Sequence, residues 1–413
     1  MRLLVVSQYF WPETFRVNEI VAEMGRRGHD VTVLTGCPNY PGGVVFEEYR
    51  RDPVRFEQYE GADVVRVPML PRGRGSVRLL LNYLSFVLGG CLFGPSRLRG
   101  REFDAVFVFQ LSPVTSAIPG LFIGRLRHLP VVMWVLDLWP DTLSALGVIR
   151  NPVVLRWVGR LVGAIYRRCA LVLGQSRSFE SNVRQWAGDS SRFRYFPGWG
   201  EAMFQGDMSA VEPAEQVRPY LDGSFNVMFA GNLGESQDMP SVLDAAEALR
   251  DRDDVRFLLV GDGRVAPWIR EELVRRGIER TVVMLGQHPL EMMPAMFRGA
   301  SALLVSLKAE PAFAMTIPGK VQAYLASGLP IIGMLDGEGA SVIEQSGAGF
   351  ACHAGDAKAL AALVVRMAAM SAVERRALGA RGREYSRREF DRDRLLTRLS
   401  DMLVEVSIER RLA

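Results

Sequence analysis

The sequence predicts an α/β protein with two Rossmann-like, doubly wound domains that face a cleft. Three observations predict this class. Short apolar strands alternate with helix-length segments, which is typical of parallel sheets covered by helices on both faces. The alternation stops near Phe196 and begins again near Phe225, and the polar segment between them contains Gly206, Pro213 and Pro219. A chain of 413 residues is long enough for a separate core in each domain.

These observations give four expected segments, which are a first domain over 1–200, a linker over 201–222, a second domain over 223–385 and a C-terminal helix over 386–413. The expected strands of the first domain are Leu3–Ser7, Val31–Thr35, Val64–Val67, Ala105–Phe109, Val131–Val135 and Leu171–Leu173. Those of the second are Phe225–Ala230, Phe257–Val260, Val282–Leu285, Ala302–Val305 and Pro330–Gly333. In such folds ligands bind at the carboxyl ends of the strands, near the point where the strand order reverses.

Composition excludes several classes of protein. Hydrophobic residues make up 48% of the chain, which excludes a mainly disordered protein. The four cysteines and four histidines are scattered without a C-x-x-C pair, so the sequence predicts neither a disulfide scaffold nor a metal site. The net charge of the chain, +4, is small and the basic residues are dispersed along the sequence, which argues against nucleic acid as a partner.

Two apolar stretches are relevant to export and membrane association. Residues 1–7 form too short an apolar run for a signal peptide and read as a cytoplasmic first strand. Residues 79–94 are more apolar, yet shorter than a membrane span needs. Arginines 72, 74 and 78 precede this stretch, and arginines 97, 99 and 101 follow it. Two interpretations stay open, namely a buried helix between solvated arginines and a helix lying on an anionic membrane surface.

Glycine-rich turns in the second domain are candidates for phosphate binding. Gly231, Asn232 and Gly234 follow a strand, with Gln237 just beyond, and Gly263 follows the next strand. Glycines let backbone amides approach a phosphate, although either segment also suits an ordinary turn. Gln287, after the strand that ends at Leu285, is a further candidate.

Pro318, Gly319 and Lys320 precede a helix expected over 321–327. The free amides of the helix start and the lysine ammonium would together form a seat for a diphosphate. The ordinary alternative is a surface lysine at a helix start. Glu338, in the turn after the last expected strand, could accept hydrogen bonds from ribose hydroxyls or simply be a solvated acid.

In the first domain, Asp137 and Trp139 follow the strand Val131–Val135. Asp137 is the candidate general base, and Trp139 could stack on a sugar or pack in the core. Asp141 suits a helix N-cap. Glu13, Arg16 and Asn18 follow the first strand and form the other candidate group on this side, with helix-cap chemistry as the alternative.

Taken in order along the chain, these motifs resemble family 4 of the GT-B glycosyltransferases, and within it the WbuB-type (L-fucosamine) transferases of lipopolysaccharide O-antigen and capsule synthesis. The resemblance covers nearly the whole chain. The motifs that carry it are Gln8–Glu13, Arg26–His29, Val31–Thr35, Pro38–Gly43, Asp137–Pro140, Gly231–Gly234, Ile317–Lys320 and Tyr324–Pro330.

The resemblance implies a retaining transferase whose C-terminal helix returns to the first domain. It implies a nucleotide-sugar donor, with UDP as the nucleotide, bound mainly by the second domain at the glycine turns and Lys320. It further implies a polyprenyl-diphosphate-linked sugar as acceptor on the side of Asp137, no obligatory metal, and a peripheral position on the cytoplasmic face of the inner membrane. The transferred sugar would be an N-acetylated amino sugar or a deoxy sugar.

The chain also departs from the family's pattern. The two glutamates that the family carries eight positions apart read Met315 and Ala323 here. Glu338 is the candidate for the ribose contact and Glu310 for a sugar contact. Two alternatives therefore accompany the transferase, namely a sugar-nucleotide epimerase on the same fold and a non-catalytic protein that binds a sugar nucleotide.

Overall fold

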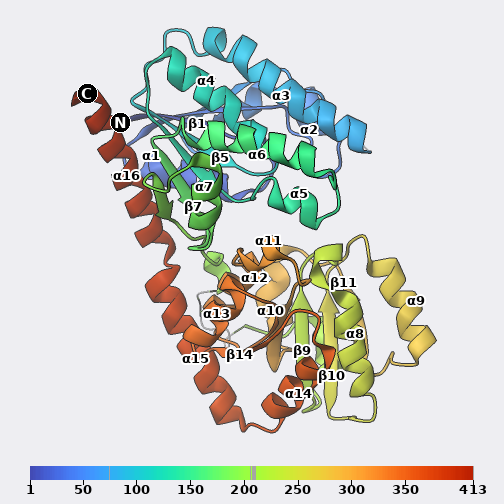
Figure 1. Ribbon diagram of the computed structural model, residues 1–413. Coiled ribbons are helices and arrows are strands. Elements are labelled where there is room, and N and C mark those ends of the chain that lie inside the picture. The colour runs from blue at the N-terminus through green and yellow to red at the C-terminus, as the bar shows by residue number, and fades with distance from the viewer. Residues whose placement is uncertain (74, 205, 207–210, 413) are drawn as a thin grey trace. The chain divides into compact units, whose positions relative to one another are not determined.

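The computed structural model describes residues 1–73, 75–204, 206 and 211–412, so that Arg74 lies outside the described residues. It divides into two compact units (Figure 1). The first unit comprises Met1–Phe196 together with the C-terminal segment from Asp393, and the second comprises Pro197–Arg392.

An eight-stranded sheet forms the centre of the first unit within the described residues, in the order β3-β4-β2-β1-β5-β6-β7-β8. Its strands are β1 (Arg2–Val6), β2 (Asp30–Thr35), β3 (Gln58–Tyr59), β4 (Ala62–Arg66), β5 (Ala105–Gln110), β6 (Val131–Val135), β7 (Leu171–Gly174) and β8 (Phe193–Tyr195). All pairings are parallel except that of β3 with β4. The strand order reverses at β1, so the loops after β1, β5 and β6 meet at the edge where ligands bind in such folds.

The helices of this unit are α1 (Arg16–Arg26), α2 (Glu47–Arg51), α3 (Ser76–Arg97), α4 (Ile118–Leu126), α5 (Asp141–Ala145), α6 (Pro152–Tyr166), α7 (Phe179–Ala187) and α16 (Arg392–Leu412). The C-terminal helix α16 joins the unit through polar contacts as well as its leucines. Arg27 Nη1 donates to Thr397 Oγ1 at 2.7 Å, and His29 Nε2 lies 2.8 Å from Ser400 Oγ. The apolar face of α16 is buried, because Leu396 and Leu399 are fully covered.

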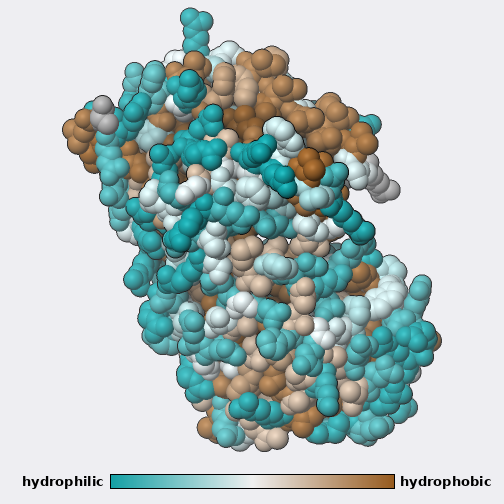
Figure 2. Space-filling view, in the orientation of Figure 1, coloured by the Kyte–Doolittle hydropathy of each residue, from teal (hydrophilic) through white to brown (hydrophobic). Residues whose placement is uncertain are grey.

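Helix α3 is longer than the expected apolar stretch. It spans 22 residues, and by length and composition alone it could cross a membrane. Glycine on one face of α3 allows the helix to pack closely against α4. A Cβ added at Gly90 would lie 2.6 Å from Pro119 Cβ of α4. Most of its leucines remain exposed, namely Leu80, Leu81, Leu84, Leu88 and Leu92. One face of α3 is therefore packed and the other is apolar and open (Figure 2).

The packed face of α3 carries a buried amide. Asn82 Oδ1 accepts hydrogen bonds from Gln8 Nε2 at 2.8 Å and Tyr9 Oη at 2.9 Å, and Asn82 Nδ2 donates to the Leu70 carbonyl at 2.6 Å. All three side chains are buried. The helix is thus bonded directly to the loop that follows β1.

A six-stranded parallel sheet forms the centre of the second unit within the described residues, in the order β11-β10-β9-β12-β13-β14. Its strands are β9 (Phe225–Ala230), β10 (Val255–Val260), β11 (Val282–Gly286), β12 (Ala302–Ser306), β13 (Ile331–Met334) and β14 (Gly349–Cys352). Its helices are α8 (Met239–Ala248), α9 (Ala266–Arg276), α10 (Met293–Phe297), α11 (Pro311–Ala314), α12 (Gly319–Ser327), α13 (Glu338–Gln345), α14 (Ala357–Ala368) and α15 (Ala372–Glu389). The strand order reverses at β9, which places the loop after β9 at the ligand-binding edge.

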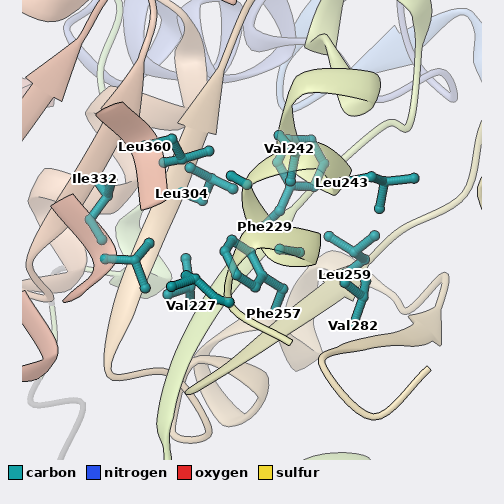
Figure 3. Close-up of a cluster of buried hydrophobic side chains, with 14 of the residues drawn as sticks. Val227, Phe229, Val242, Leu243, Phe257, Leu259, Val282, Leu304, Ile332 and Leu360 are labelled. Atoms are coloured by element: carbon teal, nitrogen blue, oxygen red, sulfur yellow. The ribbon is translucent and has the colours of Figure 1, made fainter. Parts of the chain in front are cut away.

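One core of this unit lies between the sheet and helices α8 and α14. Figure 3 shows Val227 and Phe229 of β9 among side chains from the neighbouring strands and from both helices. Alternate residues of each strand point to this face, which is why the strands read as continuous apolar runs when both faces are covered. The fold class predicted from these runs is confirmed.

Two features differ from the sequence-based expectations. The segment 201–222 was expected to be a linker, but Phe204, Ala214 and Val217 are buried in the second unit. A few apolar residues in a polar segment are enough to attach it to a core. The short strands β3, β8 and β14 were also not expected, because each has only two to four residues.

Candidate functional site

A pocket of about 740 Å³ opens at the carboxyl ends of β9 and β10 in the second unit. Six of the residues predicted to bind a nucleotide line it, namely Gly231, Asn232, Gly263, Gln287, Gly319 and Lys320. Residues from five separate segments therefore converge as the topology predicts.

Two glycine turns form one wall of this pocket by packing directly against each other. Gly231 and Gly261 both have φ of 140°. A Cβ added at Gly261 would lie 1.9 Å from the Gly231 carbonyl oxygen, and one added at Gly263 would lie 2.3 Å from the Leu233 carbonyl oxygen. No side chain fits there, so the wall is built from backbone that a ligand can approach closely.

Lys320 stands at the start of α12 and lies against the first glycine turn, because a Cβ added at Gly231 would be 2.5 Å from Lys320 Cε. Its Nζ donates to Gln237 Oε1 at 2.6 Å and lies 3.6 Å from the centroid of the Phe229 ring. Burial lowers the pKa of Lys320 to about 7. Both neighbours are uncharged, so an anion entering the pocket would favour the ammonium form and meet the positive end of the helix. Gln237, which does not line the pocket, therefore acts by holding the lysine.

The other predicted residues of this unit lie elsewhere. Gly234 and Pro318 flank the turns without lining the described pocket, and Glu338 lies in the first turn of α13. Ala323, at one of the positions where the family carries a glutamate, does line the pocket. The ribose contact predicted for Glu338 thus has no support from the shape of this cavity.

Several lining residues were not predicted. Tyr324 hydrogen-bonds to both the N–H and the carbonyl of Ala230, at 3.0 and 3.1 Å, and so fixes the end of β9. Its signal was available, since Tyr324 stands one helical turn after Lys320 on the same face. His288 and Glu201 also line the pocket. Glu201 lies in the segment interpreted as a linker, where no pattern points to it.

Asp137 and Trp139 lie together after β6 in the first unit. Trp139 Nε1 donates to Asp137 Oδ2 at 3.1 Å. Tyr83 of α3 is near enough to feel this carboxylate. Burial raises the pKa of Tyr83, Arg72 opposes that effect, and Asp137 adds to it. An electrostatic interaction between a tyrosine of the apolar helix and Asp137 was not predicted.

Asp141 was expected to cap a helix, but it does not cap α5. Pro140 occupies the N-cap position, and the Asp141 carboxylate accepts a hydrogen bond from Asn182 Nδ2 at 2.6 Å. Asp141 therefore connects α5 to α7, which leaves Asp137 as the acid available beside the loop.

Glu13 faces inward. Its side chain is 3% exposed, and its carboxylate accepts backbone N–H bonds from Phe10 at 3.0 Å and from Asn39 and Tyr40 at 2.7 Å. Burial raises the pKa of Glu13 to about 7 against the opposing effect of these bonds. Asn18 Nδ2 donates to the Glu13 carbonyl at 2.8 Å. Glu13 and Asn18 thus brace two loops, while the predicted acceptor role of half-buried Arg16 stays a prediction.

No group of three or more histidine, cysteine, aspartate or glutamate side chains among the described residues is arranged to hold a metal ion.

Comparison with known proteins identifies the class. The family described as "Glycosyl transferase 4-like domain" matches residues 14–199, and the family described as "Glycosyl transferases group 1" matches residues 224–370. The two matches correspond to the two units. The chain is a glycosyltransferase with the GT-B fold, of the family 4 type.

Individual relatives agree with this class. The chain is 27% identical over 344 residues to WcaI of Escherichia coli strain K12, a glycosyl transferase assigned to colanic acid biosynthesis, and the match covers 79% of this chain and 82% of WcaI. Among solved structures, HepE of Anabaena with UDP and glucose matches with a TM-score of 0.68 and 16% identity, over 98% of this chain and 100% of HepE. Sucrose-phosphate synthase of Thermosynechococcus elongatus matches with a TM-score of 0.74 and 15% identity, over 98% of each chain.

Proposed function

We propose that this glycosyltransferase is a retaining enzyme that transfers an N-acetylated amino sugar or a deoxy sugar from a UDP-sugar to a polyprenyl-diphosphate-linked sugar. The observation that carries the donor side is Lys320, a half-buried lysine whose neighbours Gln237 and Phe229 are uncharged and which opens on a pocket walled by backbone. The UDP bound to HepE supports the choice of nucleotide.

The chemistry follows from these groups. The bond between the anomeric carbon and the diphosphate oxygen breaks, and its electron pair remains on the diphosphate. Lys320 and the first N–H groups of α12 would stabilise the charge that develops there. The acceptor hydroxyl oxygen bonds to the same face of the anomeric carbon, and its proton passes either to Asp137 or to the departing phosphate oxygen. We propose that this needs no metal, because cationic and backbone donors meet the diphosphate.

The pathway proposed is bacterial surface polysaccharide synthesis, such as O-antigen or capsule. The names of two similar proteins support it, since WcaI is assigned to colanic acid biosynthesis and the glycosyltransferase WaaG to lipopolysaccharide biosynthesis. We also propose that the enzyme is peripheral on the cytoplasmic face of the inner membrane. The exposed leucines of α3 support contact with lipid. The closely packed glycine and the buried Asn82 on its other face favour a helix that lies on the membrane surface over a helix that crosses the membrane.

A panel of nucleotides and sugar nucleotides tests the donor side. A ligand at about a hundred times its Kd adds about 2.7 kcal/mol to stability, which a thermal-shift measurement detects. The best UDP-sugar is then incubated with and without a lipid-linked acceptor. Release of UDP only with the acceptor supports transfer, epimerised donor supports an epimerase, and binding without turnover supports a non-catalytic protein.

The acceptor side is tested by Asp137→Asn, with Trp139→Phe beside it to remove only the indole N–H. If Asp137 takes the proton, turnover falls about a hundredfold to ten-thousandfold while donor affinity stays unchanged. If Asp137 orients the acceptor, the loss falls mainly on acceptor KM. Turnover equal to that of the unmodified enzyme in Asp137→Asn would remove it from both roles.

A further inference from the structure

A second, larger cavity lies in the first unit, away from the loops that carry Asp137. Its volume is about 1060 Å³. It lies at the amino ends of β6, β7 and β8, whereas Asp137 follows the carboxyl end of β6. Helices α4 and α6 and the end of α16 form its walls. None of the residues discussed above for donor or acceptor contributes to it.

The floor of this cavity is apolar. Leu121 and Ile165 are buried at its base, and Val406 closes it from α16. Phe122 of α4 and Leu161 of α6 line it and are themselves exposed at its edge. The floor therefore continues outward into apolar surface at these two residues.

The rim of this cavity is strongly basic. Arg125, Arg168, Arg192 and Arg410 line it, and Glu409 is the acid among the described lining residues. Two of the arginines bond to neutral carbonyls, Arg168 Nη1 to Ala164 at 2.6 Å and Arg192 Nη1 to Cys169 at 2.9 Å. In the described part of the chain no ion pair is recorded for any of the four. The guanidinium groups of Arg168 and Arg192 are therefore held in place by uncharged oxygens.

Exposed apolar side chains near the cavity extend its apolar floor. Leu126 of α4 and Trp157 of α6 are exposed beside it, and Arg160 lies over the Trp157 ring at 4.9 Å. Figure 2 shows apolar residues gathered over the region of α3, α4 and α6. Aromatic and basic side chains around an apolar surface are typical of the boundary between lipid headgroups and acyl chains.

We infer that this cavity binds an anionic membrane phospholipid, with an acyl chain on the apolar floor and the phosphate among the four arginines. Charge complementarity selects this occupant. A neutral lipid would leave the arginines without a counterion, and a free phosphate would leave the floor exposed to water. The inference does not depend on the proposed transfer reaction, because it concerns the opposite end of the sheet.

The test uses monomeric short-chain lipids, so that binding to the cavity is separated from adsorption to a membrane. The full chain is titrated by calorimetry with dihexanoyl phosphatidylglycerol below its micelle concentration, with dihexanoyl phosphatidylcholine, and with glycerol 1-phosphate. We expect saturable binding of one phosphatidylglycerol, at least about tenfold weaker binding of phosphatidylcholine, and weaker binding still of glycerol phosphate. Equal affinity for the two lipids, or for glycerol phosphate and phosphatidylglycerol, would overturn the inference.

Variants then locate the site. Arg125→Gln with Arg168→Gln changes two exposed side chains and should weaken phosphatidylglycerol binding about thirtyfold. Ala164→Trp fills the cavity without changing its charge and should abolish binding. The matched control is Arg270→Gln with Arg376→Gln, two exposed arginines of the second unit, and it should bind normally. If the control loses as much affinity as the cavity pair, the attraction is a general charge effect and the site is refuted.

Discussion

Each unit contains an ionisable side chain perturbed by burial, and the two side chains have opposite kinds of surroundings. Glu13 in the first unit and Lys320 in the second both have a pKa displaced to about 7, and burial is the main cause for each. Glu13 accepts three backbone hydrogen bonds from its surrounding loops. Lys320 has one amide oxygen and one ring beside it and opens on a pocket.

The difference shows that a displaced pKa alone does not identify a functional residue. What separates the two groups is whether the protein has already satisfied them. A carboxylate held by three N–H groups stabilises loops, whereas a lysine with only neutral neighbours is left able to bind an anion. Four experiments sharpen this comparison or break it.

The largest effect is expected from Lys320→Ala. Turnover should fall about a hundredfold to a thousandfold, because a fixed cation is lost where negative charge develops. Affinity should fall more for UDP than for uridine, and Lys320→Arg should restore only part because the guanidinium has another shape. Titration of each variant with uridine, UMP and UDP measures this, with exposed Lys358→Ala as the control. Equal losses for all three ligands would show that Lys320 does not contact phosphate.

Glu13→Gln should change stability and its pH dependence. The folded-state pKa of Glu13 is raised to about 7, so the folded protein holds this proton over a pH range in which the unfolded chain has lost it. The unfolding free energy of the unmodified protein should therefore fall by roughly 1 to 3 kcal/mol between pH 4.5 and pH 7, relative to the variant.

Denaturant unfolding at several pH values measures this difference, with exposed Glu48→Gln as the control. At low pH the variant should be the less stable protein, because its amide N–H faces the Phe10 N–H. Parallel stability curves for Glu13→Gln and the unmodified protein would mean that Glu13 does not titrate in this range.

Binding of UDP should take up a proton near pH 7. The pKa of Lys320 is lowered to about 7 in the empty pocket, and a bound diphosphate raises it again. UDP affinity should therefore fall as the pH rises above about 7. Calorimetry at pH 7.5 in buffers of different ionisation enthalpy gives the number of protons, which should be below one and should vanish in Lys320→Ala.

The smallest effect is expected on α3. Leu84→Ser with Leu88→Ser replaces side chains that are 47% and 59% exposed and should reduce sedimentation with anionic vesicles several-fold, because less apolar surface enters the lipid. Val274→Ser with Val373→Ser removes similarly exposed apolar side chains from the second unit and should have no effect. Arg72 is a poor choice for this test, since its guanidinium lies 5.4 Å from the Tyr40 ring, within the first unit.

Much of this structure could be predicted from the sequence because parallel strands read as apolar runs and glycine turns follow them. The same patterns predicted Gly231, Gly263 and Lys320 at one pocket, since chain order fixes which strand ends meet. The direction of Glu13 could not be predicted, because its partners are backbone groups of a loop about 26 residues away. Glu201 was missed for the related reason that an irregular segment has no periodicity from which to infer its place.

The buried amide of Asn82 has a consequence for how sequences of this kind diverge. On an apolar helix a lone asparagine looks like the residue most easily lost, and a leucine there would raise the helix's apolar character. Yet leucine at position 82 would leave Gln8 and Tyr9 without their common acceptor inside the first unit, while the exposed leucines of α3 can interchange with other apolar residues at little cost. Among descendants of one ancestor we expect the leucines of α3 to drift and Asn82 to persist, together with Gln8 and Tyr9.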